Sequence, residues 1–78
     1  MFVEILTPDK KLFSADAEYI NVPGQAGSTG ILRKHAPLIA ALKAGKVKVR
    51  DMDKKEHYFD IKGGIVEVRN DKVILLAE

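Results

Sequence analysis

The sequence lacks cysteine and tryptophan, and it has few prolines and few aromatic residues of any kind. Without cysteine the chain can form neither a disulfide nor a zinc centre with thiolate ligands. Its longest apolar run, residues 36–42, is far shorter than the ~20 residues that a membrane-spanning helix needs. No signal peptide is evident at the N-terminus. We therefore expect a protein of the cytoplasmic side.

Length and charge restrict the class of protein further. A chain of 78 residues suffices for a single domain, residues 1–78, and a domain of this size buries only roughly 60% of the surface that its unfolded chain exposes. A partner that covers more surface would therefore add to its stability. The 46% hydrophobic and 31% charged residues are typical of a soluble globular protein. The formal charge of +2 is too small to indicate nucleic-acid binding by itself.

Alternation of apolar and polar residues predicts a series of short strands. The expected strands cover residues 2–6, 12–13, 19–22, 46–50, 57–62, 65–69 and 72–77. Between them we expect a proline turn at 7–10, an end of the second strand at 14–16, a polar loop at 51–55, a bend or bulge at Gly63-Gly64 and a hairpin turn at Asn70-Asp71. So many short strands at this spacing are typical of an all-β sandwich or barrel.

The segment 22–38, VPGQAGSTGILRKHAPL, follows neither a helical nor a strand period. Its glycines recur at every third residue: Gly24, Gly27 and Gly30. Glycine permits positive φ angles and close backbone approach, so this composition predicts a shaped loop. We expect the apolar side chains of Ile31, Leu32 and Leu38 to hold that loop against the core.

Residues 38–42 are ambiguous between helix and strand. Alanine and leucine favour a helix, but the run is too short for its periodicity to decide. Gly45 is expected to end this element in either case. Residues 46–50 are the clearest strand of the chain, with Val47 and Val49 inward and three cations outward.

The last predicted strand is apolar on both faces, because residues 73–76 include no polar side chain. Such strands are usually covered on both sides. Tyr19 and Ile65 add outward apolar groups on other strands. Either this is the central strand of a small sandwich with a mildly apolar surface, or another protein covers the second face, near Ile74 and Leu76.

No pattern of catalytic or ligand-binding residues stands out. The glycine spacing matches neither of the phosphate-binding motifs GxxxxGK[ST] and GxGxxG. Pro37 would also disturb the helix that such a loop needs at its end. His35 and His57 have no partners at a recognisable zinc spacing. Ser14, Asp16 and His35 supply the residue types of a hydrolytic triad, but no nucleophile elbow surrounds the serine. We therefore expect no enzyme activity, no metal and no cofactor.

A basic surface is a further alternative. The cations of residues 46–50 are explained as the solvated side of one strand, and Asp51, Asp53 and Glu56 interrupt the cations that follow. Stacking on nucleic-acid bases needs exposed aromatic rings, and the chain offers only Tyr19 and Tyr58 as tyrosines. A free-standing sandwich or barrel that binds nucleic acid or carbohydrate is thus an alternative without a supporting motif.

Three motifs in order resemble one known family along essentially the whole chain. They are TPDKKLFSADAEYINVPG, GxxGILxxHAPLIAALKAGKV and IKGGIVEVRNDKVILLAE. The sequence is similar to the N-terminal β-sandwich domain of the epsilon subunit of F-type ATP synthases, the subunit called delta in mitochondria. The PGxxGxxGIL-x-x-HAPL segment, the Lys43-Ala44-Gly45 turn and the GGxxEVxxxxVxxLA ending carry the resemblance.

The resemblance implies a small antiparallel β-sandwich of two sheets with about ten short strands, in which residues 38–42 are a strand. It implies a non-catalytic subunit of the central stalk that joins the gamma subunit to the c-ring and couples proton flow to ATP synthesis. The subunit would lie at the cytoplasmic face and approach the membrane only through the c-ring. Longer family members continue into two C-terminal helices that can inhibit ATP hydrolysis. We expect this chain, which has no such helices, to lack that activity.

The resemblance also assigns contact positions. The positions toward the gamma subunit are Thr7, His35 and Ala40. The positions toward the c-ring are Gly27, Ser28, Thr29, Gly30, Ile31 and Leu32, and we add the adjacent cations Arg33 and Lys34 to this contact as a hypothesis of our own. Ser28 and Thr29 stand where the family often has an acidic residue, and Arg33 stands at a frequent proline. Arg33 and Lys34 are available for acidic or carbonyl groups on the polar loops of the ring.

Overall fold

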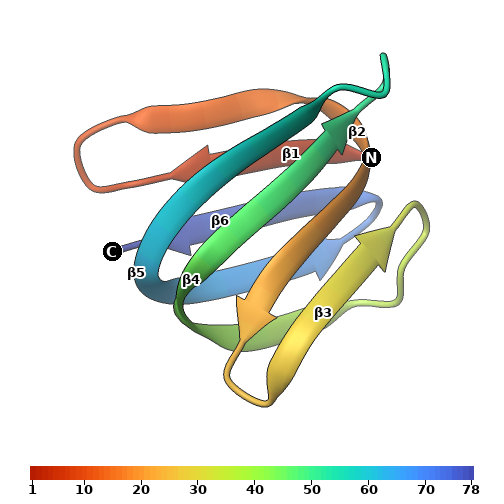
Figure 1. The fold of residues 1–78 in the computed structure, drawn as a ribbon. Coiled ribbons are helices and arrows are strands. Elements are labelled where there is room, and N and C mark those ends of the chain that lie inside the picture. Colours follow the sequence, from red (N-terminus) through yellow and green to blue (C-terminus); the bar gives the residue numbers. More distant parts are fainter.

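The computed structural model describes all residues, 1–78, as strands and turns (Figure 1). The six strands are β1 (Phe2–Leu6), β2 (Lys11–Gly24), β3 (Gly27–Leu32), β4 (Leu38–Asp51), β5 (Glu56–Arg69) and β6 (Lys72–Ala77). The predicted all-β fold is confirmed, and residues 38–42 are strand, as the resemblance implies. With no helix present, nothing helical is long and apolar enough to cross a membrane.

The strands are fewer and longer than the ten that were predicted. β2, β4 and β5 have 14 residues each, and Figure 1 shows β4 and β5 bending sharply instead of ending. Residues 14–16 and Gly45, which were expected to end strands, lie inside β2 and β4. These two predictions were wrong because a bent strand keeps its hydrogen bonds through the bend, where its sequence pattern is interrupted.

The bends change which residues face inward. Along β4 the buried positions are even-numbered at Leu42 and odd-numbered from Val47 onward. Along β5 the change is the reverse, from Ile61 to Val66. Since strand alternation has a period of two, each change of phase looks like a strand end in the sequence. The sequence pattern therefore divides each long strand into two short ones.

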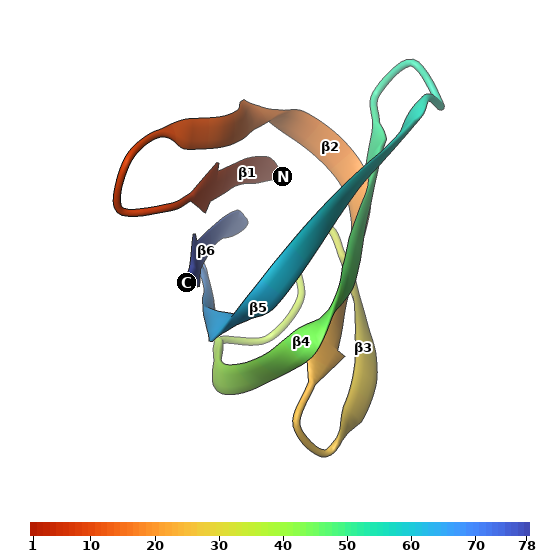
Figure 2. The ribbon, with the colours of Figure 1, turned by 60° about the vertical axis from the view of Figure 1, so that its left-hand side comes forward.

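The strands pair in the order β1-β6-β5-β4-β2-β3, and β1 also pairs with β2, so the ladder closes on itself. β1 and β6 are parallel, and the other pairs are antiparallel. The first part of β2 pairs with β1, and its second part with β4 and β3. Figure 2 shows β2 arching from the β1 side of the molecule to the β4 side. The strands thus form one continuous, closed sheet in place of the two separate sheets that were predicted, because the long bent strands belong to both sides, and β3 forms a free edge. The parallel β1–β6 pair also departs from the predicted antiparallel arrangement.

One apolar core of 16 buried residues fills the interior, and every strand contributes to it. Its fully buried members include Val3, Ile5, Ile20, Ile31, Val47, Val49, Val66, Val73 and Leu75. The core contains no polar or charged side chain. Branched side chains pack well on pleated strands, and a closely packed interior with a closed ladder makes the body stiff.

The segment predicted as a shaped loop is mostly strand. Gly27–Leu32 is β3, which pairs with β2 along its whole length. Its alternation is weak because an edge strand buries little, and here only Ile31 is fully buried. Leu38 also packs against the core, whereas Leu32 is exposed. The expectation that these side chains hold the segment is therefore right for Ile31 and Leu38 and wrong for Leu32.

Candidate interaction surfaces

The turn between β3 and β4 is fixed to the hairpin between β5 and β6. The backbone N–H of Lys34, which has a φ of 60°, donates to Oδ1 of Asp71 at 2.9 Å. This bond favours the carboxylate and lowers the pKa of Asp71 below its ordinary value. The backbone N–H of His35 donates to the carbonyl of Leu32 at 3.2 Å. The ring Nδ1 of His35 donates to the carbonyl of the next residue at 2.7 Å, so this side chain is held within its own turn.

The residue types of a hydrolytic triad are not joined by hydrogen bonds. Ser14 and Asp16 lie exposed on β2, and His35 bonds only to its own turn. The other histidine, His57, places its Nε2 2.8 Å from the carboxylate of Asp51. No three His, Cys, Asp or Glu side chains are close enough to hold a metal ion.

An apolar surface covers the outer side of β4, β5, β6 and β1. Cross-strand neighbours form two rows, and their apolar members, here called the apolar face, are Leu6, Ile39, Ala41, Ile65, Ile74 and Leu76. Ile39 is 73% exposed, Ile65 50% and Leu76 52%. Single exposed apolar residues are common, but a contiguous group on a small domain indicates an interaction site. The expectation of outward apolar groups near the last strand is thus confirmed.

The three positions assigned to the gamma subunit do not form one cluster. Thr7 follows Leu6 at one corner of the apolar face, and His35 lies before the start of β4 at the opposite corner. Ala40 is on β4 next to Ile39, but its side chain packs against the core. Two of the positions therefore flank the apolar face, and the third supports it from inside.

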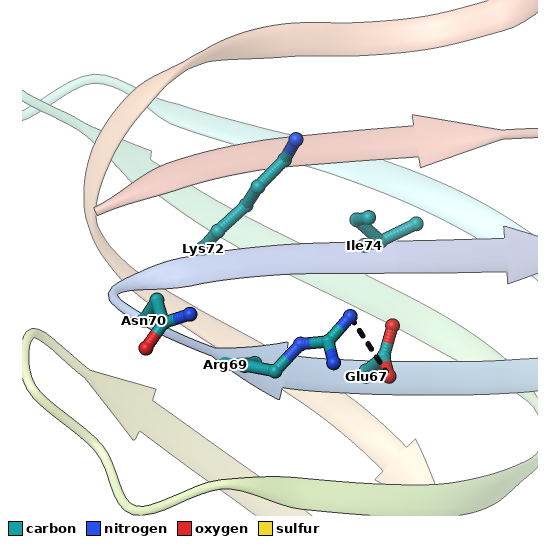
Figure 3. A pocket seen from close by; sticks show the side chains of 5 residues that line it. All are labelled: Glu67, Arg69, Asn70, Lys72 and Ile74. Atoms are coloured by element: carbon teal, nitrogen blue, oxygen red, sulfur yellow. Dashed lines mark ion pairs between the residues drawn. The ribbon is translucent and has the colours of Figure 1, made fainter.

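Charged residues border the apolar face beside the β5–β6 hairpin. A hollow of about 280 Å³ lies there. Figure 3 shows the five side chains that line it: Glu67, Arg69, Asn70, Lys72 and Ile74. A guanidinium nitrogen of Arg69 lies 3.9 Å from the carboxylate of Glu67, and Nζ of Lys72 lies 4.0 Å from that of Glu4. Exposed ion pairs at such distances contribute little to stability. Because Glu67 pairs across the strands with both Ile39 and Ile74, its carboxylate interrupts the second row of the apolar face.

The outer side of β2, the second half of β4 and the first half of β5 is polar. The guanidinium of Arg50 lies 5.4 Å from the ring centroid of Tyr19, and both Arg50 and Lys48 pair with Glu56, at 3.7 and 3.1 Å. The hydroxyl of Tyr58 donates to Glu56 at 2.7 Å, which lowers the pKa of Glu56 and raises that of Tyr58. Both tyrosines lie here. Lys48 and Arg50 are paired with Glu56, whereas Lys46, whose Nζ lies 5.8 Å from the ring centroid of Tyr58, forms no ion pair. This surface is therefore mixed in charge.

The positions assigned to the c-ring form β3 and the turn after it. Gly27 and Ser28 lie at the β2–β3 hairpin, and Leu32 ends the strand before the turn, roughly 17 Å away at the usual rise per residue. Side chains alternate across this strand, so Ile31 points into the core while Leu32 is exposed. Ile31 therefore supports the surface without presenting its side chain.

The middle of β3 lies under an aromatic ring. A Cβ atom on Gly30 would lie only 2.8 Å from the hydroxyl of Tyr19, so a larger residue would displace that ring. The Asn21 amide donates to the same hydroxyl at 3.2 Å. A side chain at position 30 would therefore need the Tyr19 ring to shift.

The turn between β4 and β5 is organised by Asp51. Its Oδ1 accepts the backbone N–H groups of Asp53 and Lys55, at 2.8 and 3.0 Å, and its Oδ2 lies 2.8 Å from Nε2 of His57. The bond from His57, followed by that from Lys55, lowers the pKa of Asp51. The exposed side chain of Met52 lies in this turn.

Sequence reasoning missed two groups of surface residues. Ile39 and Ala41 point outward on β4. The sequence could have indicated this, because in a strand they alternate with Leu38 and Leu42, which point inward. Met52 was passed over as part of a polar loop. No sequence pattern placed Met52 close to β3, because only the pairing of distant strands does so.

Comparison with known proteins identifies the family. Residues 1–78 match the family described as the ATP synthase Delta/Epsilon chain, beta-sandwich domain. The ATP synthase epsilon chain of Chlorobium limicola is 46% identical over 76 residues, which are 97% of this chain and 86% of that one. The epsilon chain of Maridesulfovibrio salexigens is 38% identical over 78 residues, all of this chain and 54% of that one.

Two solved structures share the fold. A chain of the Euglena gracilis mitochondrial ATP synthase, in a structure of OSCP, F1 and the c-ring, matches with a TM-score of 0.90 and 19% identity, over 96% of this chain and 48% of that chain. A chain from the central stalk and c-ring of the Tetrahymena thermophila mitochondrial ATP synthase matches with a TM-score of 0.83 and 22% identity, over 99% and 62%. The resemblance noted in the sequence is thus confirmed. This chain belongs to the ATP synthase delta/epsilon chain β-sandwich family.

Proposed function

We propose that this chain is a non-catalytic rotor subunit of a proton-translocating ATP synthase, where it joins the gamma subunit to the c-ring in the central stalk. The contiguous apolar face on a stiff, closed body is the observation that carries the proposal. The names of the relatives and the central-stalk origin of one structural match support it. The chain would then act by transmitting torque, and no cofactor enters this role.

The gamma subunit is the partner that we propose for the apolar face. Removing exposed isoleucine and leucine side chains from water favours binding by about 25 cal/mol per Å² of apolar area buried. Thr7 and His35 would contact gamma at two corners of this face. Ala40 would support the contact indirectly, by packing inward between Ile39 and Ala41, which point outward. Such an interface keeps the subunit fixed on gamma while the rotor turns.

The c-ring is the partner that we propose for β3 and the turn that follows it. Its contact positions would be Gly27, Ser28, Thr29, Gly30, Ile31, Leu32, Arg33 and Lys34. The exposed backbone of β3 supplies shape, and the two cations after it supply charge for the polar loops of the ring. The subunit would thereby lie at the cytoplasmic face of the membrane and touch it only through the ring.

Stiffness is the property that coupling requires. Torque from the c-ring reaches gamma without slipping only if the joint between them deforms little under load. Here the closed ladder joins both sides of the sandwich, and the core contains no polar residue. A dense interior of this kind has low compressibility.

A paired substitution tests the gamma contact. Ile65→Ser with Leu76→Ser removes two neighbouring members of the apolar face, and we expect the affinity for the gamma subunit to fall at least roughly tenfold. Tyr58→Ser, on the polar side, is the matched control and should leave the affinity unchanged. Circular dichroism checks that all variants are folded. Unchanged gamma binding by the double variant would contradict the proposal.

A charge reversal tests the ring contact separately. Arg33→Glu with Lys34→Glu should weaken attachment to purified c-rings while leaving gamma binding intact, because neither side chain is a member of the apolar face. Equal attachment of the variant and the unaltered chain would show that these cations make no ring contact.

A further inference from the structure

A second, smaller apolar site lies where β3 ends beside the turn between β4 and β5. Leu32 is 61% exposed and Met52 is 53% exposed. Together with Glu18 and Arg33 they line a hollow of about 350 Å³. Its two apolar side chains are 20 residues apart in the sequence, and neither is a member of the apolar face. The hollow is therefore distinct from the apolar face, although His35 follows Arg33 by two residues.

The charges around the hollow differ in how far they are neutralised. The Glu18 carboxylate lies 2.8 Å from Nζ of Lys54 and 3.6 Å from the guanidinium of Arg50, so it has two cationic partners within the chain. Arg33 forms no ion pair. The rim thus presents one free cation beside an apolar floor. Its complement is an apolar side chain that is carried next to a carboxylate.

We infer that the hollow between Leu32 and Met52 anchors an apolar side chain of a c-ring polar loop, with Arg33 pairing a carboxylate beside it. This inference rests on the proposed function, because Leu32 and Arg33 are among the positions assigned to the ring. Met52 is new to the contact, since it comes from a different turn. It extends the ring contact from the single segment around β3 to the β4–β5 turn.

β3 is short, and a contact through this strand alone would be weak without an additional anchor. An edge strand with glycine at two of its six positions offers few side chains that a partner can grip. Leu32 and Met52 add exposed apolar area at the end of that strand, and its burial against a side chain of the partner favours binding. The stable turn around Asp51 holds Met52 in place, since that carboxylate bonds the backbone on both sides of the tip.

Binding of the chain, held on its gamma subunit, to detergent-purified c-rings tests the anchor. We expect Met52→Asp to weaken ring binding by about tenfold or more, because it places a carboxylate in the apolar floor. Met52→Leu keeps the apolar volume and should bind within about twofold of the unaltered chain. Lys55→Asp, a new acid on the same turn outside the hollow, is the matched control and should also stay close to the unaltered chain.

The outcomes separate this inference from the proposed function. If the unaltered chain binds the ring and Met52→Asp binds as tightly, the anchor is wrong and the ring contact stands. If Lys55→Asp weakens binding as much as Met52→Asp, the effect is one of charge and the anchor is also wrong. If the unaltered chain binds gamma but not the ring, both fail. Binding of gamma by every variant shows that each one is folded.

Discussion

The carboxylate of Asp71 accepts a hydrogen bond from the backbone of Lys34, a residue 37 positions earlier in the chain. The backbone carbonyl of Asp71 also accepts the N–H of Phe2 at 3.1 Å. One residue of the β5–β6 hairpin thus ties together the start of β1 and the turn that carries His35. The position of that turn at the corner of the apolar face depends on a contact between distant parts of the sequence.

Replacing Asp71 should release this turn. In Asp71→Ala the N–H of Lys34 loses its acceptor, and we expect its amide exchange to become faster by on the order of tenfold, with a lower thermal midpoint. Asp71→Asn keeps an oxygen acceptor and should retain most of the protection. Exchange measured by NMR decides this, and equal protection of Lys34 in Asp71→Ala would show that the bond does not hold the turn.

Two neighbouring leucines should differ sharply in their effect on stability. Leu75 is fully buried, so Leu75→Ala should lower the free energy of unfolding by about 2–5 kcal/mol through lost burial and a cavity. Leu76 lies on the apolar face, and Leu76→Ala should cost less than about 1 kcal/mol in the isolated chain. Urea unfolding measures both. Similar losses for the two variants would mean that the inward and outward assignment of β6 is wrong.

The bend of β5 requires glycine at position 64. Gly64 has a φ of 150°, and a Cβ atom there would clash with the backbone carbonyl of Leu76. We expect Gly64→Ala to destabilise the fold by more than about 2 kcal/mol, because both the backbone angle and the neighbouring strand oppose it.

Gly27→Ala is the matched comparison for that substitution. Gly27 also has a positive φ, 132°, but no atom lies within 4 Å of the position of its Cβ. Its substitution should cost only about 1 kcal/mol, from the backbone angle alone. Chemical unfolding of the two variants gives the comparison, and a larger loss for Gly27→Ala would contradict this account of the bend.

Acid should destabilise the protein through carboxylates that are bonded in the folded state. The pKa of Asp51 is lowered from 3.8, first by the bond from His57, and that of Glu18 is lowered from 4.5, first by the bond from Lys54. A lowered pKa contributes stability that is present above the ordinary value and is lost as the pH falls through the lowered value. Stability should therefore decline as the pH falls below about 4.5.

Substitution of Asp51 checks the origin of this acid sensitivity. Asp51→Asn should be less stable than the unaltered chain at neutral pH, and it should lose less stability on acidification because one of the titrating groups is gone. Thermal midpoints measured from pH 7 to acid give both slopes. Parallel curves for the two proteins would assign the sensitivity to other carboxylates.

The local elements were predictable where the pattern is regular and exposed to one side. Residues 46–50 form a strand with Val47 and Val49 buried, as predicted. The Asn70-Asp71 turn was recognised from its residue types, and both residues have positive φ angles, 52° and 58°. These predictions succeeded because each depends on a few adjacent residues.

Features that depend on distant contacts were not predictable in this way. The change of inward phase near Gly45 comes from the bend of β4 over its partner, and it was read as the end of a strand. β3 was predicted as a loop because only Ile31 is buried in it, so its sequence shows little alternation. Its strand conformation depends on pairing with β2. The outward position of Ile39 followed only once residues 38–42 were known to be strand.

The central claim is that the apolar face binds the gamma subunit, and titration calorimetry of this chain with the gamma subunit of the same source tests it most directly. The account predicts a one-to-one complex with a negative heat-capacity change, the signature of apolar burial, and loss of both in the Ile65→Ser, Leu76→Ser variant. Absence of a complex, or a complex that the variant forms with the same affinity and heat-capacity change, would contradict it.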